Sequence, residues 1–482
     1  MARLETRLKA AAAYIIPNVS EAPVAQLLED CCTTARDSGD AHVWLLFIAV
    51  SGALPTEAEL QALRRALSLA PAGNLGAAAL RTCAPVALAH HSQLRTLDLR
   101  SGLVSLVDFS ARHGFTSGVQ RFTREVSRRW SERANVTFVA FNDDPSALRH
   151  LSADERMRLV DWSSERATEE SQHRDNPWGT VVVPWKATLF LPEVPQYGQS
   201  PVLAALARFS GNRVVAFGHD MIPIASASEL RLDEPLRFGS YLTVLRHATE
   251  VVANSATSAE EFRGYVGALH AQGLEGPAVS HLLLPVERLS GTADQLPLSE
   301  RAMVLAVGSH EPRKNQIALV YAAEQLWREG LSFELRLLGG RGPRNFTVLR
   351  DAISALQLAK RPITVENDVS DAELAAAYRA ARFSAFISLD EGYGLPVAES
   401  LASGTPVLTT NYGSTAEIAS GGGCVLVDPR DDEAIVDSLR RMLTDDRLIT
   451  QLRAEALARD DDTWDSFSQR LWERVTLSEA RS

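Results

Sequence analysis

The chain has 482 residues, of which 45% are hydrophobic and 23% are charged, and its formal net charge is −11. This composition excludes a disordered chain, and the acidic balance argues against general binding of nucleic acid or of an anionic membrane. The length is enough for about three domains.

No apolar run reaches the ~20 residues of a transmembrane helix, so at most a peripheral membrane contact is expected. The four cysteines include the adjacent Cys31 and Cys32, show no metal-ligand spacing, and favour a reducing cytoplasm.

Residues 1–96 form the first predicted unit, a helical appendage rich in alanine and leucine. Thr56 and Glu59 have the spacing of a capping box, and leucines recur on one helical face after them, at Leu60, Leu63 and Leu67. We expect these helices to pack onto the unit that follows.

Residues 97–290 are predicted to form a doubly wound α/β domain. Short apolar runs indicate its strands, in the segments "LVSLVDFS", "VTFVAFN", "TVVVPWKATLFLP", "NRVVAFGHDMIPI" and "EVVANS". Helices are expected between them, near residues 118–130, 153–162, 201–209 and 258–268. Nearly continuous apolar strands that alternate with helices indicate a parallel sheet covered on both faces.

Residues 298–455 repeat this pattern after a polar linker near residues 285–297. The expected strands are "MVLAVGS", "FELRLLGG", "PITVEND", "SAFISL", "PVLTT" and "CVLVD", and Ser370 and Glu373 form a second capping box. Residues 456–482 are predicted to form a terminal helix with Trp464, Phe467, Leu471 and Val475 on one stripe. Two doubly wound domains leave a cleft between the carboxyl edges of their sheets, where such folds bind ligands.

The stretch "EGYGLPVAES" begins at residue 391 and runs from a strand end through a glycine turn into a helix. Free backbone N–H groups at such a helix start favour an anion, and Gly392 and Gly394 let the backbone approach a ligand closely. Glu391 and Glu399 flank this site, and a carboxylate suits a vicinal diol because each oxygen accepts one O–H. The combination predicts a nucleotide sugar. For Glu399 the alternative is a favourable interaction with the helix dipole, worth ~0.3 to 1 kcal/mol.

This stretch and the following "SGTPVLTT" resemble the donor-site signature of retaining GT-B glycosyltransferases, the glycosyl transferases group one or family four. The resemblance implies an α/β GT-B fold, with two Rossmann-like domains facing a cleft and the helical region as an addition. It also implies that Glu391 contacts the transferred sugar and Glu399 the ribose. The backbone of Gly392, Tyr393, Gly394 and Leu395 would then bind the sugar and the diphosphate.

Further stretches extend the resemblance over about residues 103–475. "VGSHEPRKNQ" would bring Lys314 to the diphosphate; many relatives have an arginine where this chain has Ser309, so Arg313 is either its replacement or a surface charge. In "TSGVQR", Ser117 and Gly118 would cap the diphosphate from the first domain. "FGHDMIPI" would place His219 beside the sugar, the alternative being a structural pair of His219 with the adjacent aspartate. In "NDVSDAELAAAYRAA", Val369 would contact the base through its backbone.

The predicted function is transfer of a hexose, with retention, from a nucleotide-sugar donor to a glycan, lipid-linked or protein acceptor in a surface-polysaccharide or glycoconjugate pathway. The expected location is the cytoplasm, at most at the inner face of the membrane. No cofactor or metal is expected, because the chain offers only "NDD" at 142–144 and "RDDDTW" at 459–464, and the second, which matches an Asp-x-Asp motif, lies far along the chain from any phosphate loop. The alternatives are a sugar-nucleotide epimerase or phosphorylase, and a partner subunit without catalytic activity.

Two regions keep more than one interpretation. Besides packing, the appendage could mediate homo-oligomer assembly, acceptor recognition or membrane attachment. The arginines of the helix expected near residues 118–130, namely Arg121, Arg124, Arg128 and Arg129, form either a solvated face or a surface for anionic lipid carriers.

Overall fold

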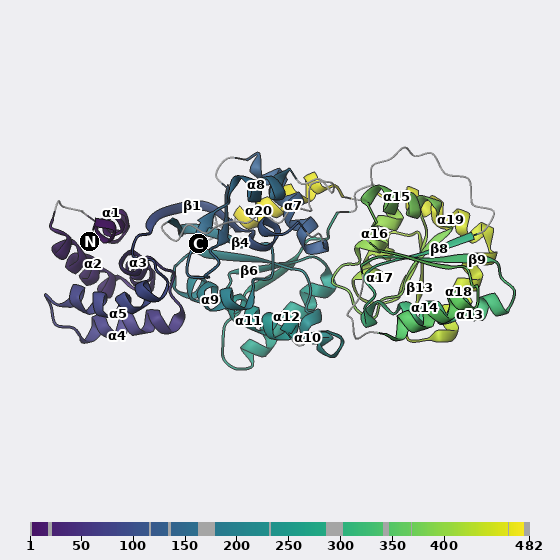
Figure 1. The fold of residues 1–482 in the computed structure, drawn as a ribbon, viewed down its shortest axis with the longest axis horizontal. Helices are drawn as coiled ribbons and strands as arrows, with labels where there is room; N and C mark the ends of the chain where they lie inside the picture. The colour runs from purple at the N-terminus through teal and green to yellow at the C-terminus, as the bar shows by residue number, and fades with distance from the viewer. Residues whose placement is uncertain are drawn as a thin grey trace.

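The computed structural model describes residues 2–17, 22–114, 117–133, 136–161, 179–230, 233–285, 302–340, 347–367, 369–460 and 462–476. Five N-terminal helices, a first sheet and a second sheet follow one another along the longest axis (Figure 1). Apart from Pro285, the predicted linker lies outside the described residues. Among the described helices, none combines the length and apolar character needed to cross a membrane.

The appendage consists of helices α1 (Ala2–Ile15), α2 (Val24–Ser38), α3 (Asp40–Ser51), α4 (Glu57–Leu69) and α5 (Leu75–Ala89). The predicted capping box starts α4, where Thr56 and Glu59 each accept the other's backbone N–H. The central helix is α3, whose residues 43–51 are all buried. A helix that is apolar on every side must be surrounded by other elements, and α1, α2, α4 and α5 all contact α3.

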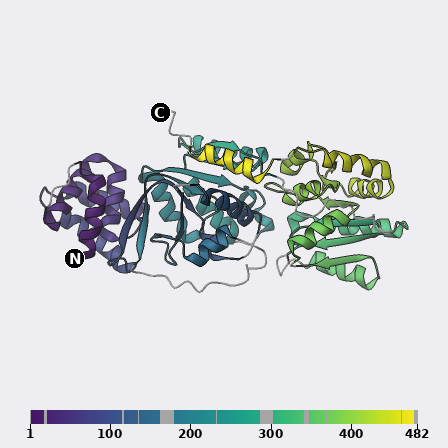
Figure 2. The same ribbon diagram turned by 90° about the horizontal axis from the view of Figure 1, so that it is seen from above.

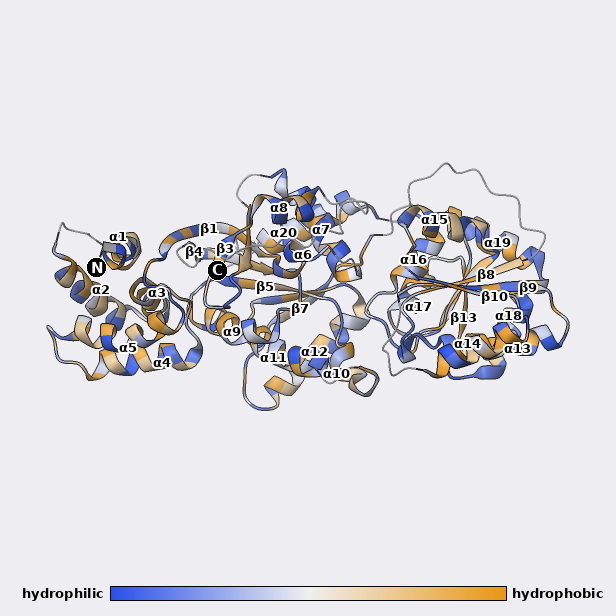
Figure 3. Cartoon of the chain, in the orientation of Figure 1, coloured by the Kyte–Doolittle hydropathy of each residue, from blue (hydrophilic) through white to orange (hydrophobic). Residues whose placement is uncertain are grey.

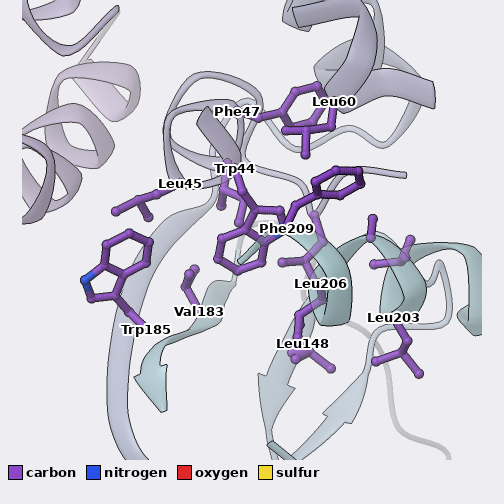
Figure 4. Packing of buried hydrophobic residues seen from close by; sticks show 14 of the residues in the cluster. Trp44, Leu45, Phe47, Leu60, Leu148, Val183, Trp185, Leu203, Leu206 and Phe209 are labelled. Carbon is purple, nitrogen blue, oxygen red and sulfur yellow. The ribbon is translucent and has the colours of Figure 1, made fainter. Parts of the chain in front are cut away.

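The expected packing of the appendage onto the first sheet is confirmed, and one hydrophobic core joins the two parts. Phe47 on α3 and Leu60 on α4 belong to the same buried cluster as Val183 and Phe209 of the first α/β domain (Figure 4). A polar contact that sequence reasoning missed holds the segment that enters β1 against helices α1 and α3 of the appendage. The guanidinium of Arg7, whose residue is 2% exposed, donates to four backbone carbonyls, those of Ala49, Val50, Gln93 and Arg95, at 2.9 to 3.0 Å.

The first sheet has seven strands in the order β3-β2-β1-β4-β5-β6-β7, parallel except for β3. They are β1 (Thr96–Leu106), β2 (Val136–Phe141), β3 (Leu148–His150), β4 (Thr180–Leu191), β5 (Arg213–Gly218), β6 (Glu250–Ala253) and β7 (Ala278–His281). The helices of this domain are α6 (Asp108–Arg112), α7 (Gly118–Ser131), α8 (Ala153–Val160), α9 (Ser200–Phe209), α10 (Ile222–Ala225), α11 (Asp233–Leu245) and α12 (Ala256–His270).

Two predicted strands of this domain are too long. β1 ends at Leu106 and residues 108–112 form helix α6, while β5 ends at Gly218 and residues 222–225 form helix α10. Short apolar runs do not distinguish a strand from the helical turn that follows it. Sequence reasoning also missed α11 and the short edge strands β3 and β7, while the last residue of the helix predicted at 153–162 lies outside the described residues.

The second sheet has six parallel strands in the order β10-β9-β8-β11-β12-β13. They are β8 (Ala302–Val307), β9 (Phe333–Leu338), β10 (Ile363–Glu366), β11 (Phe383–Phe386), β12 (Val407–Thr410) and β13 (Cys424–Val427). The 3₁₀ helix η3 (Pro312–Lys314) precedes α13 (Gln316–Arg328), α14 (Val348–Leu358), α15 (Asp371–Ala380), α16 (Leu395–Ala402), α17 (Gly413–Ala419), α18 (Asp432–Thr444) and α19 (Asp446–Leu457). The capping box of Ser370 and Glu373 is present, and hydrophobic residues predominate along strands such as β5 and β8 (Figure 3).

The terminal helix α20 (Trp464–Thr476) leaves the second domain and lies against the first (Figure 2). Its predicted stripe is buried, with Phe467, Leu471 and Val475 at 0% exposure. On α7, the Nε1–H of Trp130 donates to the carbonyl of Ser468 at 3.2 Å. The stripe was therefore predicted correctly, whereas the surface that receives it was not.

Candidate active site

The carboxyl edges of the two sheets meet at the glycine turn of the E-x7-E stretch. The Gly392 carbonyl accepts hydrogen bonds from the hydroxyls of Ser255 at 2.9 Å and Ser258 at 3.1 Å. A Cβ at position 392 would lie 2.5 Å from the carbonyl oxygen of His219, which a side chain cannot approach. Glycine is therefore required here because the backbone of one domain contacts the backbone of the other.

A group of charges surrounds the first glutamate of the stretch. Glu391 accepts a hydrogen bond from the ammonium of Lys314, which follows β8 on η3, and one from the hydroxyl of Ser388 at 2.7 Å. The Arg313 guanidinium lies 3.1 Å from the same carboxylate. Burial alone would raise the pKa of Glu391, but Lys314 and Arg313 outweigh it and hold the pKa below its usual value. Glu391 is therefore an ionised carboxylate, and two cations lie beside it.

Arg313 is held in the cleft rather than displayed on the surface. Its side chain is 17% exposed, and its Nε donates to Glu311 at 3.0 Å. The other carboxylate oxygen of Glu311 accepts from the Ser309 hydroxyl at 2.7 Å. Ser309, where the resemblance leads one to expect an arginine, thus helps to orient the acid that holds Arg313. The surface-charge interpretation of Arg313 is wrong.

The second glutamate, Glu399, contacts both domains. Its Oε1 accepts from Arg121 of α7 at 2.6 Å, and its Oε2 accepts from the hydroxyl of Tyr378 on α15 at 3.2 Å. The sequence pattern places Glu399 in the first turn of the helix that begins near Pro396; this expectation is wrong, because Glu399 is the fifth residue of α16. The helix-dipole alternative weakens accordingly, because that interaction falls off beyond the first turn.

The arginines of α7 are engaged within the protein. Arg121 pairs with Glu399, and Arg124, which is 2% exposed, donates to the carbonyl of His113 at 2.6 Å. Arg128 and Arg129 both pair with Glu125. Neither the solvated face nor the lipid-binding surface describes Arg121 and Arg124.

His219 follows β5 and faces the cleft as a neutral ring. Its Nε2 lies 2.7 Å from the carbonyl oxygen of Pro192, so Nε2 carries the proton. The ring packs edge-on against Phe122 and Phe217. Burial lowers the pKa of His219 to about 4. The structural pair with the adjacent aspartate is therefore wrong, since Pro192 is the partner.

Replacement of His219 by glutamine tests this protonation state. The histidine pKa is about 4 in the folded protein and 6.5 ordinarily, so acidification below pH 6.5 protonates the unfolded chain first. The unfolding free energy that the neutral His219 ring contributes above pH 6.5 is therefore lost as the pH falls toward 4. Between about pH 7.5 and about pH 5 we expect the wild type to lose about 2 kcal/mol of unfolding free energy relative to His219→Gln. Urea unfolding of both proteins at the two pH values measures this loss. If the difference in unfolding free energy between the wild type and His219→Gln were the same at both pH values, the folded protein would bind the proton as readily as the unfolded chain, and the neutral ring would be refuted.

A cavity of about 690 Å³ opens between the two domains beside these groups. The predicted residues Ser117, His219 and Arg313 line it. Its further lining was not predicted and includes Phe109, Gln120, Glu193, Asp220, Arg237 and Phe238. Lys314, Glu391, Glu399, Val369 and residues 392–395 are not part of this lining, although Lys314 and Glu391 contact each other and lie beside Arg313.

The start of α7 lies against the start of α16. A Cβ on Gly118 would lie 2.9 Å from Cδ1 of Leu395, so the two helix N-termini, predicted to cap one diphosphate, do meet. Ser117 caps α7 together with Gln120, whose side-chain oxygen accepts from the backbone of Ser117 at 3.2 Å. Val369 precedes α15 and packs against the core beneath β8 and β9.

Glu193 is a buried acid that sequence reasoning missed, and Asp220, considered only as a structural partner of His219, is a half-buried acid that lines the same cavity. Glu193 accepts from the backbone N–H groups of Phe109 and Ser110, both at 3.0 Å, and burial raises its pKa to about 7. Burial likewise raises the pKa of Asp220 to about 6. Each acid lies two residues after the end of a buried strand, β4 for Glu193 and β5 for Asp220, and this position was the available signal.

The aspartates of the two stretches considered for metal binding make other contacts. Asp143 pairs with Arg112 at 2.7 Å and Asp144 with His90 at 2.6 Å. In the second stretch, Asp462 pairs with Arg470, and Asp461 lies outside the described residues.

Comparison with known proteins identifies a family domain in the second α/β part of the chain. Residues 292–459 match the family model described as Glycosyl transferases group 1. The chain is 25% identical over 254 residues to the serotype-specific mannosyltransferase WbdA of Escherichia coli, covering 51% of this chain and 31% of that protein. It is 30% identical over 261 residues to the D-inositol 3-phosphate glycosyltransferase of Nocardiopsis dassonvillei, covering 52% of this chain and 60% of that protein. The chain thus spans less than two thirds of these relatives.

Solved structures resemble a larger share of the chain. The structure of Anabaena Alr3699/HepE in complex with UDP and glucose aligns with a TM-score of 0.55 and 14% identity, over 78% of this chain and all of that one. Sucrose-phosphate synthase from Thermosynechococcus elongatus aligns with a TM-score of 0.52 and 17% identity, over 78% of this chain and 97% of that one. With its two facing parallel sheets, the chain has the GT-B fold and carries a glycosyl transferases group 1 domain at residues 292–459.

Proposed function

We propose that the chain is a retaining glycosyltransferase that moves a hexose from a nucleotide-sugar donor to an acceptor. The observation that carries this proposal is the cluster of Lys314, Arg313 and Glu391 at the carboxyl edge of the second sheet, facing the first domain across the cleft. Two cations beside one ionised acid suit a ligand with an anionic part and a polyhydroxylated part. A sugar nucleoside diphosphate has both.

The cations would act on the leaving group. When the bond between the sugar and the diphosphate breaks, negative charge develops on the diphosphate oxygen, and Lys314 and Arg313 would stabilise it more in the transition state than in the bound donor. Both are partly shielded from water, with side chains 10% and 17% exposed, which strengthens such an interaction. The positive ends of α7 and α16, which meet at Gly118 and Leu395, would add to it.

Glu391 and His219 would bind the sugar. An ionised carboxylate accepts two hydroxyl protons, and Glu391 can do so once the donor phosphates draw Lys314 and Arg313 toward themselves. The neutral ring of His219 lines the cavity from the other domain. In a reaction with retention, the acceptor oxygen attacks the anomeric carbon from the face that the diphosphate leaves, and the acceptor proton passes to a diphosphate oxygen. No carboxylate nucleophile is then needed.

The acceptor is proposed to be a glycan, a glycolipid or a protein of a surface-polysaccharide or glycoconjugate pathway. The activities of similar proteins support this class, since they include an O-antigen chain mannosyltransferase B of Escherichia coli that is 33% identical over 155 residues. The cavity supports it as well, because its acids Glu193 and Glu234 and its aromatic rings Phe109 and Phe238 are side chains that bind sugars.

Calorimetric titration with UDP, GDP, ADP and dTDP in the presence of EDTA tests the donor site. We expect one nucleotide to bind without metal, and Glu399→Gln to weaken it about tenfold or more, because hydrogen bonds to a charged acceptor are lost. Incubation with the matching nucleotide sugars, followed by NMR of the new linkage, tests retention. Failure of all four nucleotides to bind would contradict the proposal and favour a partner subunit without catalytic activity.

A further inference from the structure

We propose that Arg121, which belongs to the first domain, positions Glu399 of the second domain to receive the two hydroxyls of a donor ribose. The inference deepens the proposed function and rests on it. It adds a residue for which neither the sequence motifs nor the family match supplies a role. It also makes ribose recognition depend on contact between the two domains.

The contacts of Glu399 leave acceptor positions for a diol. Arg121 donates to Oε1 at 2.6 Å and Tyr378 donates to Oε2 at 3.2 Å, so each oxygen receives one donor. A carboxylate has about four lone-pair positions. One position therefore remains on each oxygen, and two adjacent hydroxyls can take one oxygen each. The two protein donors hold the carboxylate in one orientation while leaving both oxygens able to bind.

The position of Arg121 explains why it reaches Glu399. It lies in the first turn of α7, where Gly118 approaches Leu395 so closely that a Cβ would lie 2.9 Å from the leucine side chain. The ion pair is partly shielded, with the Arg121 side chain 25% and the Glu399 side chain 13% exposed. Burial raises the pKa of Glu399, and the charge of Arg121 is the largest effect that opposes it. Arg121 thus favours the ionised carboxylate that a diol requires.

The two donors come from different domains, and this has a consequence for binding. Tyr378 is part of the second domain and accompanies Glu399 wherever that domain moves. Arg121 reaches Glu399 only when the start of α7 lies against α16. Ribose binding and contact between the domains should therefore favour each other, because each stabilises the same orientation of one carboxylate.

The test compares ribonucleotides with nucleotides that lack the diol. Wild type and Arg121→Gln are titrated with UDP, GDP and ADP and with the 2′,3′-dideoxy form of whichever ribonucleotide binds. We expect Arg121→Gln to weaken the ribonucleotide about tenfold while the dideoxynucleotide binds both proteins equally. Glu399→Gln should give the same pattern, and Arg121→Lys should recover part of the affinity.

Arg128→Gln is the matched control, because Arg128 lies about two turns further along α7 and pairs with Glu125 at 3.0 Å. It should leave both affinities unchanged. Equal binding of the dideoxynucleotide also shows that Arg121→Gln is folded.

Three results would overturn the inference. If Arg121→Gln weakened the binding of the ribonucleotide and of the dideoxynucleotide equally, Arg121 would act on the phosphates and not through the ribose. Tighter binding of the ribonucleotide would mean that Arg121 occupies the place of the diol. An unchanged affinity would leave Arg121 without a role at the donor. The wild type is titrated with dTDP as well, and its failure to bind any of the four nucleotides would instead refute the proposed function itself, so the two failures are distinguishable.

Discussion

Replacement of Lys314 by methionine is expected to slow sugar transfer at least about a hundredfold, the effect typical of removing one group that stabilises transition-state charge. The ammonium is the partner of Glu391 in the structure, and Arg313 lies beside the same carboxylate. Arg313 can stabilise part of the charge on the leaving diphosphate, so some activity should remain. Initial rates at saturating donor and acceptor measure the change in kcat.

The same variant should be less stable than the wild type. The Glu391 side chain is only 11% exposed and loses its closest cation, and breaking a buried ion pair costs about 3–5 kcal/mol, less here because Arg313 remains. The double variant Lys314→Met/Glu391→Gln should regain stability in urea unfolding without regaining activity. This pair of results separates the catalytic effect from the structural one.

Lys9→Met is the matched control for a lost lysine, because the Lys9 side chain is 61% exposed on α1 of the appendage. It should retain normal turnover and stability. A near-normal kcat in Lys314→Met would refute the assignment of Lys314 to the leaving group.

Replacement of Phe47 by alanine should lower the unfolding free energy by about 3–5 kcal/mol, the usual cost of a large cavity in a core. Phe47 is 0% exposed and belongs to the cluster that joins the appendage to the first sheet. Because the core is continuous, the appendage and the sheet should unfold together. Urea unfolding followed by circular dichroism measures both the midpoint and the number of transitions.

Leu69→Ala on α4 is the control, because Leu69 is 85% exposed and a surface substitution usually changes stability by less than about 0.5 kcal/mol. A separate unfolding transition of the appendage, or a small effect of Phe47→Ala, would contradict a shared core.

Local patterns in the sequence were sufficient for most of the architecture. The capping boxes at Thr56 and Ser370 and the buried stripe of α20 were predicted from residues a few positions apart. Errors occurred where two conformations share a composition, as at residues 108–112, where a helical turn directly follows a buried strand. Short elements with few apolar residues, such as β3, carry too little periodicity to be detected.

Local sequence patterns predicted two doubly wound sheets, a helical appendage, and a glycine turn flanked by Glu391 and Glu399, because periodicity, capping and turn residues act over short distances along the chain. Only the tertiary structure decided which side chains meet. Arg121 and Glu399 are 278 positions apart, and Glu417 accepts from the backbone of Ala256 at 2.9 Å across the domain boundary. Such pairs form because folding places the carboxyl edges of the two sheets opposite each other, where a buried charge must find a partner from whichever domain supplies one.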